Sequence, residues 1–166
     1  MSTGSPPLHP VLEPFAFMLG SWRGRGEGSY PTIEDFSYLE EIAFGHVGKP
    51  FVAYGQKTRD DGAGLPMHAE HGYFRPLSRD RLEVVMVHPT GILESLVGTV
   101  SSSAVTDLIL DLRTVSVTGT ATAKEVTEVS RRIEVAGDEL RYDIAMAAVG
   151  QPLTHHLSGT LERSEG

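Results

Sequence analysis

The sequence predicts an all-β protein: an antiparallel up-and-down barrel of about ten strands, preceded by a short N-terminal helical segment. Three observations lead to this prediction. From Gly20 onward, apolar and polar residues alternate with a period of two, which is typical of half-buried strands. Clusters of turn-forming residues interrupt the alternation at the regular spacing of sandwiches and barrels. Every connection between the strands is short, which favours a meander that closes on itself and leaves no exposed edge.

The first element is a helical segment within residues 8–20, LHPVLEPFAFMLG, whose prolines limit it to one or two turns of helix or 3₁₀-helix ending at Gly20. The first strand follows directly, from Gly20 to Tyr30, and nine more are predicted by alternation or by β-branched residues between turn-forming clusters. These nine lie at residues 36–46, 50–58, 67–77, 81–88, 91–100, 105–117, 120–135, 139–149 and 153–163.

The composition indicates a single domain over residues 1–166, with frayed ends at 1–8 and 164–166. The net charge of −8 argues against nucleic acids and anionic membranes as partners, because both attract basic surfaces. The chain has no cysteine, which excludes disulfides, thiolate metal sites and cysteine nucleophiles. It shows no secretory signal pattern and no apolar run of about 18 residues, the length of a transmembrane helix. We therefore expect a cytoplasmic protein.

The stretch GSWRGRGEGSYPTI, residues 20–33, places four glycines at even positions. Its spacing matches neither a phosphate-binding loop nor a dinucleotide fingerprint, and a strand follows it rather than a helix. The even positions form a face with Trp22, Tyr30 and otherwise bare backbone, whereas the odd positions form a charged face. Such glycines indicate either a sharp bend or a broad, flat group lying against the strand. First strands of this kind also occur in fatty-acid-binding and lipocalin-type proteins, so we expect a ligand-holding barrel.

Seven histidines are candidate ligands for a metal. His68 and His71 are three residues apart on one predicted strand, so they face opposite sides and make a poor chelating pair. His46 and His88 lie beside predicted turns, where a surface position is expected. His9 lies in the N-terminal segment and carries no signal.

His155 and His156 are adjacent on the last predicted strand, so only one of them can face the barrel interior. A turn of two or four residues before this strand would place His155 inside, together with Leu157 and Leu161. A turn of three or five residues would place His156 inside instead. The periodicity leaves both alternatives open.

Several blocks of the sequence resemble the nitrobindins, a family of small haem-binding β-barrels related in shape to fatty-acid-binding proteins. The first block is Gly-x-Trp-x-Gly-x-Gly with the trailing Tyr-Pro-Thr-Ile, residues 20–33. The resemblance continues through FSYLEEIAFGHVGKPFVAY, MHAEHGYFR, ATAKEVTEV and AVGQPLTHHL, and so covers nearly the whole chain. Together these blocks are specific, whereas Gly-x-Trp-x-Gly alone is not.

The resemblance implies which residues hold the haem. In nitrobindins the axial ligand is the histidine directly before a leucine near the C-terminus, which implies His156 here; His155 is then an additional histidine that lies in solvent or competes for iron. Met67, His68 and Met146 match positions that line the haem pocket, although methionine is also a common core residue. Thr32 and Ile33 follow the Tyr-Pro turn and are expected over the opposite side of the haem.

Lys124 has two interpretations of equal weight. Its neighbours Glu125 and Glu128 favour a solvated lysine on a strand. The resemblance implies instead a lysine beside the haem, where its ammonium group pairs with a propionate.

The family resemblance implies one ferric haem b that binds nitric oxide and isomerises peroxynitrite to nitrate at an open axial position. A pocket side lined by isoleucine and methionine offers no acid or base, which disfavours peroxidase chemistry. Two alternatives remain. One is a carrier of a fatty acid or other apolar molecule, for which Tyr38, Tyr142 or Arg75 would bind the carboxylate. The other is a haem-based nitric oxide sensor that acts through a partner.

Overall fold

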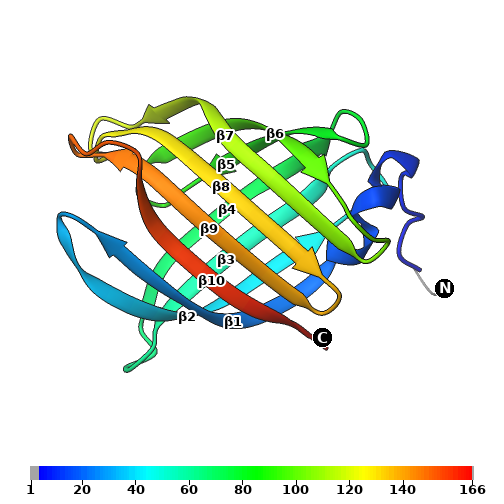
Figure 1. Cartoon of the computed structure of the whole chain (residues 1–166), viewed down its shortest axis with the longest axis horizontal. Coiled ribbons are helices and arrows are strands. Elements are labelled where there is room, and N and C mark those ends of the chain that lie inside the picture. Colours follow the sequence, from blue (N-terminus) through cyan, green and yellow to red (C-terminus); the bar gives the residue numbers. More distant parts are fainter. Residues whose placement is uncertain (1–3, 166) are drawn as a thin grey trace.

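The computed structural model describes residues 4–165 and shows, within them, a closed antiparallel barrel of ten strands and one 3₁₀-helical segment (Figure 1). Each strand pairs with its neighbours in sequence, and β1 closes the ring by pairing with β10. The predicted fold class is therefore confirmed. The elements are η1 (Pro10–Met18), β1 (Gly20–Tyr30), β2 (Ile33–Gly45), β3 (Val52–Asp60), β4 (Pro66–Pro76), β5 (Arg81–Val87), β6 (Ile92–Ser101), β7 (Asp107–Gly119), β8 (Val126–Ala136), β9 (Glu139–Ala148) and β10 (Thr154–Ser164).

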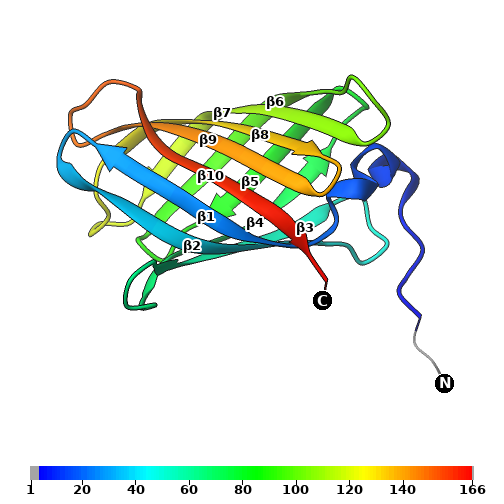
Figure 2. The same cartoon turned by 60° about the horizontal axis from the view of Figure 1, so that its bottom comes forward.

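The two ends of the barrel are built differently, as Figures 1 and 2 show. At one end, the helix end, η1 inserts fully buried side chains from Leu12, Phe15 and Met18, and the Trp22 indole donates a hydrogen bond to the carbonyl of Met18 at 2.9 Å. At the other end lie the turns that follow the odd-numbered strands. We call this end the mouth and define it by residues 31–32, 61–65, 88–91, 120–125 and 149–153.

Both chain termini are ordered further out than the sequence predicted. Ser164, predicted in a frayed end, pairs with Ser21 as the last residue of β10, and Leu8 packs against the core. The predicted frayed residues 1–3 and 166 lie outside the described part of the chain. Among residues 4–165, no helix has the length and apolar character needed to cross a membrane.

The glycines of β1 make room for aromatic rings of the neighbouring strand. A side chain at Gly26 would collide with the ring of Tyr38, and one at Gly28 would collide with the ring of Phe36. Both rings lie on β2, which pairs with β1 along its whole length. The broad, flat groups predicted from the glycines are therefore, at these two positions, side chains of the protein itself.

The barrel interior is filled. Below the mouth lies a layer of buried polar side chains, and between this layer and the helix end lies an apolar core. The internal void described between Tyr54, Glu70, Arg131 and Tyr142 measures only about 20 Å³, which is room for about one water molecule. This void is too small for a drug-sized ligand. The buried polar residues are Glu40, Gln56, Thr58, Glu70, Glu94 and Arg131.

Candidate functional site

The strand order brings the predicted site residues to the same end of the barrel, although they come from five parts of the sequence. β4 and β10 are four strands apart in the closed ring, so His68 and His156 lie on nearly opposite walls. Each of the six predicted residues lies in a mouth turn or in the strand residues next to one. They are Thr32 between β1 and β2, Met67 and His68 at the start of β4, Lys124 between β7 and β8, Met146 near the end of β9 and His156 at the start of β10.

A β-bulge in β10 determines which of the two adjacent histidines faces inward. His155 pairs with Ala145 of β9, whereas Leu157 pairs with Ile144, so His156 is the extra residue between them. His155 is exposed and His156 is half-buried. Both alternatives from the sequence assumed an uninterrupted alternation, and the bulge breaks that alternation. It allows Leu157 and His156 to lie on the same side of the strand.

The His156 ring is fixed by its surroundings. Its Nδ1 lies 3.1 Å from the carbonyl oxygen of Ser29, and the rings of Tyr30 and Phe36 approach it edge-on with centroids at 5.2 and 6.5 Å. Because a carbonyl oxygen only accepts, Nδ1 carries the proton and Nε2 keeps its lone pair. Burial lowers the pKa of His156, which favours the neutral ring. This is the state that a metal-binding histidine needs, so the donor fits a haem iron.

His68 faces the mouth from the opposite wall and begins a chain of hydrogen bonds. Its Nε2 lies 3.2 Å from Nδ1 of His88, and Nε2 of His88 lies 2.7 Å from Glu94 Oε1. Burial lowers the pKa of His68, and the Glu70 carboxylate partly opposes this shift. The prediction that this side of the pocket holds no acid or base is therefore incomplete, because two imidazoles lie there.

The surface position predicted for His88 is wrong. Its side chain is only 8% exposed and lies among the buried polar groups. The sequence did contain a signal for this position. Leu82, Val84 and Met86 alternate as the inward residues of β5, and continuing their parity by one step puts His88 inside.

Arg131 forms the centre of the polar layer beneath the histidines. Its guanidinium group donates to both oxygens of Glu70, at 2.7 and 3.1 Å, and to Glu94 at 2.9 Å. The Tyr54 hydroxyl donates to Glu70 at 2.7 Å. Burial alone would raise the pKa of Glu70, but the Arg131 charge and hydrogen bonds lower it to about 2. The lowered pKa favours the charged form of Glu70.

A second buried carboxylate, Glu40, has no cationic partner in the contacts that the structure describes. It accepts hydrogen bonds from Gln56 at 2.6 Å and from the Tyr142 hydroxyl at 2.7 Å, and the Tyr38 hydroxyl lies 2.6 Å from that of Tyr142. Burial raises the pKa of Glu40 to about 7, although these hydrogen bonds lower it. The two tyrosines suggested for a carrier are thus already engaged. Arg75, the third, is exposed and bonds Glu83 at 2.9 Å.

The remaining predicted residues lie at the rim of the mouth. Met67 is 45% exposed and borders an outer groove of about 400 Å³ together with Lys57 and Arg59. Lys124 is exposed in the turn before β8, so it is not a strand residue. Thr32 is exposed, whereas Met146 is half-buried and packs against the core. Contact of these four side chains with a haem stays a prediction.

The chain is similar to known proteins over nearly its whole length. Residues 11–163 match the family model described as the THAP4-like, heme-binding beta-barrel domain. A protein of Mycolicibacterium paratuberculosis named peroxynitrite isomerase 1 is 52% identical over 158 residues, which cover 94% of this chain and 96% of the relative. A peroxynitrite isomerase of Nocardia farcinica is 49% identical over 156 residues, covering 94% and 92%. The crystal structure of Rv2717c from M. tuberculosis superposes with a TM-score of 0.93 at 46% identity, covering 96% of this chain and all of that one.

Proposed function

The chain belongs to the family of THAP4-like haem-binding β-barrel domains, the nitrobindins, and from this premise we propose that it is a peroxynitrite isomerase that holds one ferric haem b at its mouth through Nε2 of His156. The observation that carries the proposal is the hydrogen bond from His156 Nδ1–H to the Ser29 carbonyl. It fixes the tautomer and the direction of the ring, as expected of an axial ligand.

When bound, the haem supplies the iron at which peroxynitrite rearranges to nitrate and to which nitric oxide binds reversibly. The chain supplies the surroundings. Tyr30 and Phe36 hold the His156 ring in position from two sides, and the filled barrel beneath the mouth keeps bulk water from reaching the ligand from below. Lys124 and Thr32 are exposed at the rim. We expect the Lys124 ammonium group to pair with a haem propionate and Thr32 to lie over the side of the haem opposite His156.

His68 lies on the opposite wall of the mouth and adds a polar group to the proposed haem site. In the neutral network, His88 donates from Nε2 to Glu94 and accepts at Nδ1 from His68 Nε2–H. Nδ1 of His68 then keeps its lone pair, so this ring accepts a hydrogen bond at the mouth but donates none. A ring nitrogen with a free lone pair is a potential general base beside the proposed haem site.

A fatty-acid carrier is the weaker hypothesis. Carriers of drug-sized apolar molecules enclose cavities of about 300–1,000 Å³, whereas the internal void here is about 20 Å³. The layer that a fatty acid would reach holds the carboxylates of Glu40, Glu70 and Glu94, which would repel its head group. A nitric oxide sensor would use the same haem site, and only turnover distinguishes it from an isomerase.

The test is a titration of the purified chain with hemin, followed by the Soret band. We expect a sharp band that saturates at one equivalent in the wild type and in His155→Ala, the matched control on the outer face. We expect His156→Ala to abolish it. The hemin-loaded protein should then accelerate peroxynitrite decay to nitrate. Loss of the band in His155→Ala alone, or no stoichiometric band in the wild type, would contradict the proposal.

A further inference from the structure

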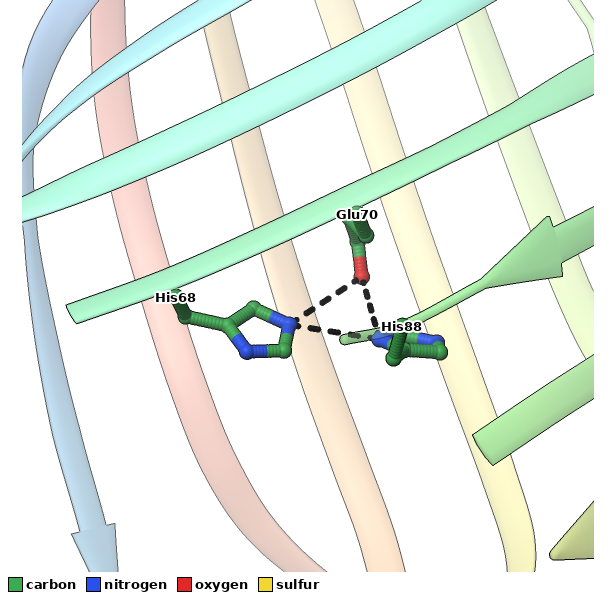
Figure 3. Close-up of side chains that lie close together, drawn as sticks. All are labelled: His68, Glu70 and His88. Atoms are coloured by element: carbon green, nitrogen blue, oxygen red, sulfur yellow. Dashed lines mark hydrogen bonds and ion pairs between the residues drawn. The ribbon is translucent and has the colours of Figure 1, made fainter. Parts of the chain in front are cut away.

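Three potential metal ligands converge between the mouth and the polar layer (Figure 3). They are Nε2 of His68, Nδ1 of His88 and Oε2 of Glu70. The two imidazole nitrogens are 3.2 Å apart, Glu70 Oε2 lies 3.4 Å from His88 Nδ1, and it lies 3.9 Å from His68 Nε2. His68 and Glu70 come from alternate positions of β4, and His88 comes from the turn after β5.

These distances suit a divalent transition-metal ion. Zinc binds imidazole nitrogen and carboxylate oxygen at about 2.0–2.2 Å, so two ligands of a tetrahedral site lie roughly 3.3–3.6 Å apart. The observed separations bracket this value, so only small side-chain movements would bring all three donors to bonding distance. Two imidazoles and one carboxylate are also a donor set that suits zinc and its first-row neighbours.

The surroundings orient the three donors as in known metal sites. The second ring nitrogen of His88 bonds Glu94 at 2.7 Å, the carboxylate–histidine arrangement that keeps the other nitrogen free for a metal. Arg131 and Tyr54 hold the Glu70 carboxylate. Arg131 also donates to the same Oε2 at 3.1 Å, and a carboxylate oxygen has a second lone pair for a metal.

The local charge and hydrogen bonding favour an added cation. Two buried carboxylates, Glu70 and Glu94, share the single guanidinium group of Arg131. Within residues 4–165, the buried Glu94 Oε2 has no hydrogen-bond partner. Metal binding would need only a change of tautomer at His68, because the proton on Nε2 can move to Nδ1, and this side chain is 35% exposed to solvent.

We propose that His68, Glu70 and His88 form a binding site for one divalent transition-metal ion of the zinc class, separate from the haem ligand His156. The buried Glu70 and His88 form the floor of the site, and the partly exposed His68 leaves the fourth coordination position open toward the mouth. His68 is also predicted to line the haem pocket, so this ion and a haem would lie next to one another.

The test uses the purified, haem-free chain with Co²⁺ as a spectroscopic probe and Zn²⁺ as its competitor. We expect visible d–d bands of four- or five-coordinate cobalt that saturate at one equivalent and disappear when Zn²⁺ is added. His68→Ala should weaken binding more than about 100-fold, beyond the 10–100-fold loss expected for an outer-shell change. Because His68 is partly exposed, we expect the His68→Ala variant to fold. His88→Gln should weaken cobalt binding to a similar extent.

The matched control is His71→Ala, on the same strand as His68 but exposed on the outer face. His71→Ala and His156→Ala should both keep the cobalt bands. A spectrum that stays octahedral and weak, or bands that survive in a folded His68→Ala variant, would overturn the metal site. Either result is independent of the hemin titration, because no haem is present.

Discussion

The helix end and the mouth are made by the same ten strands, yet they differ in almost every physical respect. At the helix end, the side chains of Leu12, Phe15, Met18 and Trp22 are all 0% exposed and pack together in the apolar core. At the mouth, turns replace the helical plug, and His156 stands half-buried at a bulge. The closed end provides stability, and the open end can bind a ligand because it is not packed shut.

The polar layer separates these two regions. Its charges are buried but largely paired, and it prevents the apolar core from extending up to the histidines. If this division is correct, a substitution at the helix end should reduce mainly the stability of the fold, and a substitution beside His156 should reduce mainly the affinity for hemin. The largest change in the free energy of unfolding is expected at the helix end, and the smallest is expected at the mouth turns.

Trp22→Ala should produce the largest loss of stability. The indole is fully buried, donates to Met18 and lies beneath the Arg163 guanidinium at 4.3 Å, so its removal leaves a cavity. We expect the free energy of unfolding to fall by about 3–5 kcal/mol, as measured by urea denaturation. Hemin affinity of the folded fraction should be unchanged.

Phe36→Ala, beside His156, should show the reverse: a smaller loss of stability than Trp22→Ala and weaker hemin binding. Equal losses of hemin affinity in the two variants would contradict the division of roles between the helix end and the mouth.

Glu40→Gln should change how stability depends on pH. The pKa of Glu40 is raised from 4.5 in the unfolded chain to about 7 in the fold, so the protonated form stabilises the protein. That stability is present below pH 4.5 and is lost as pH rises through 7. Glutamine keeps the protonated shape, so the variant should gain about 1–3 kcal/mol relative to the wild type at pH 8.

Unfolding free energies at pH 5 and pH 8 measure this effect, with Glu27→Gln on the exposed face of β1 as the control. The advantage of Glu40→Gln should grow between the two pH values, and the control should show no such growth. A constant difference would mean that Glu40 is charged throughout this range.

Val149→Asn should give the smallest change in stability, and it should stabilise the protein, which is unusual for a surface substitution. Val149 lies in the turn before β10 with φ of +46°, a left-handed conformation that a β-branched residue adopts only with strain. Asparagine tolerates it, so we expect a gain of about 0.5–1 kcal/mol in thermal or urea unfolding. Val85→Asn is the matched control, since Val85 is also 41% exposed but lies in the regular strand β5. That control should lose stability.

The fold could be predicted because it depends on local signals. Alternation predicted a strand over residues 139–149, and β9 forms there with Leu140, Tyr142 and Ile144 buried and Met146 half-buried. The short turns between successive strands left one simple arrangement, a closed meander. The position of the helical segment was also predictable from its prolines and the change of period at Gly20, but the observed 3₁₀-helix of nine residues, Pro10–Met18, is longer than the one or two turns expected.

The details of the site could be predicted less well, because they depend on contacts between distant strands. The bulge at His156 has no signature in the alternation, so the choice between the two histidines needed the family resemblance. The ion pair between Glu70 and Arg131 joins residues 61 positions apart. No local pattern marks either partner as buried. His88 is the exception, since the parity of β5 could have placed it inside.

The hydrogen bond between Ser29 and His156 also bears on how the protein is made. These residues are 127 positions apart, and they meet only when β10 closes the ring against β1. β10 is the last strand of the barrel in the sequence, so a chain that has not yet formed β10 lacks the ordered His156 that we propose as the haem ligand. If His156 holds the haem as proposed, the haem can bind this histidine in its ordered position only after the barrel has closed.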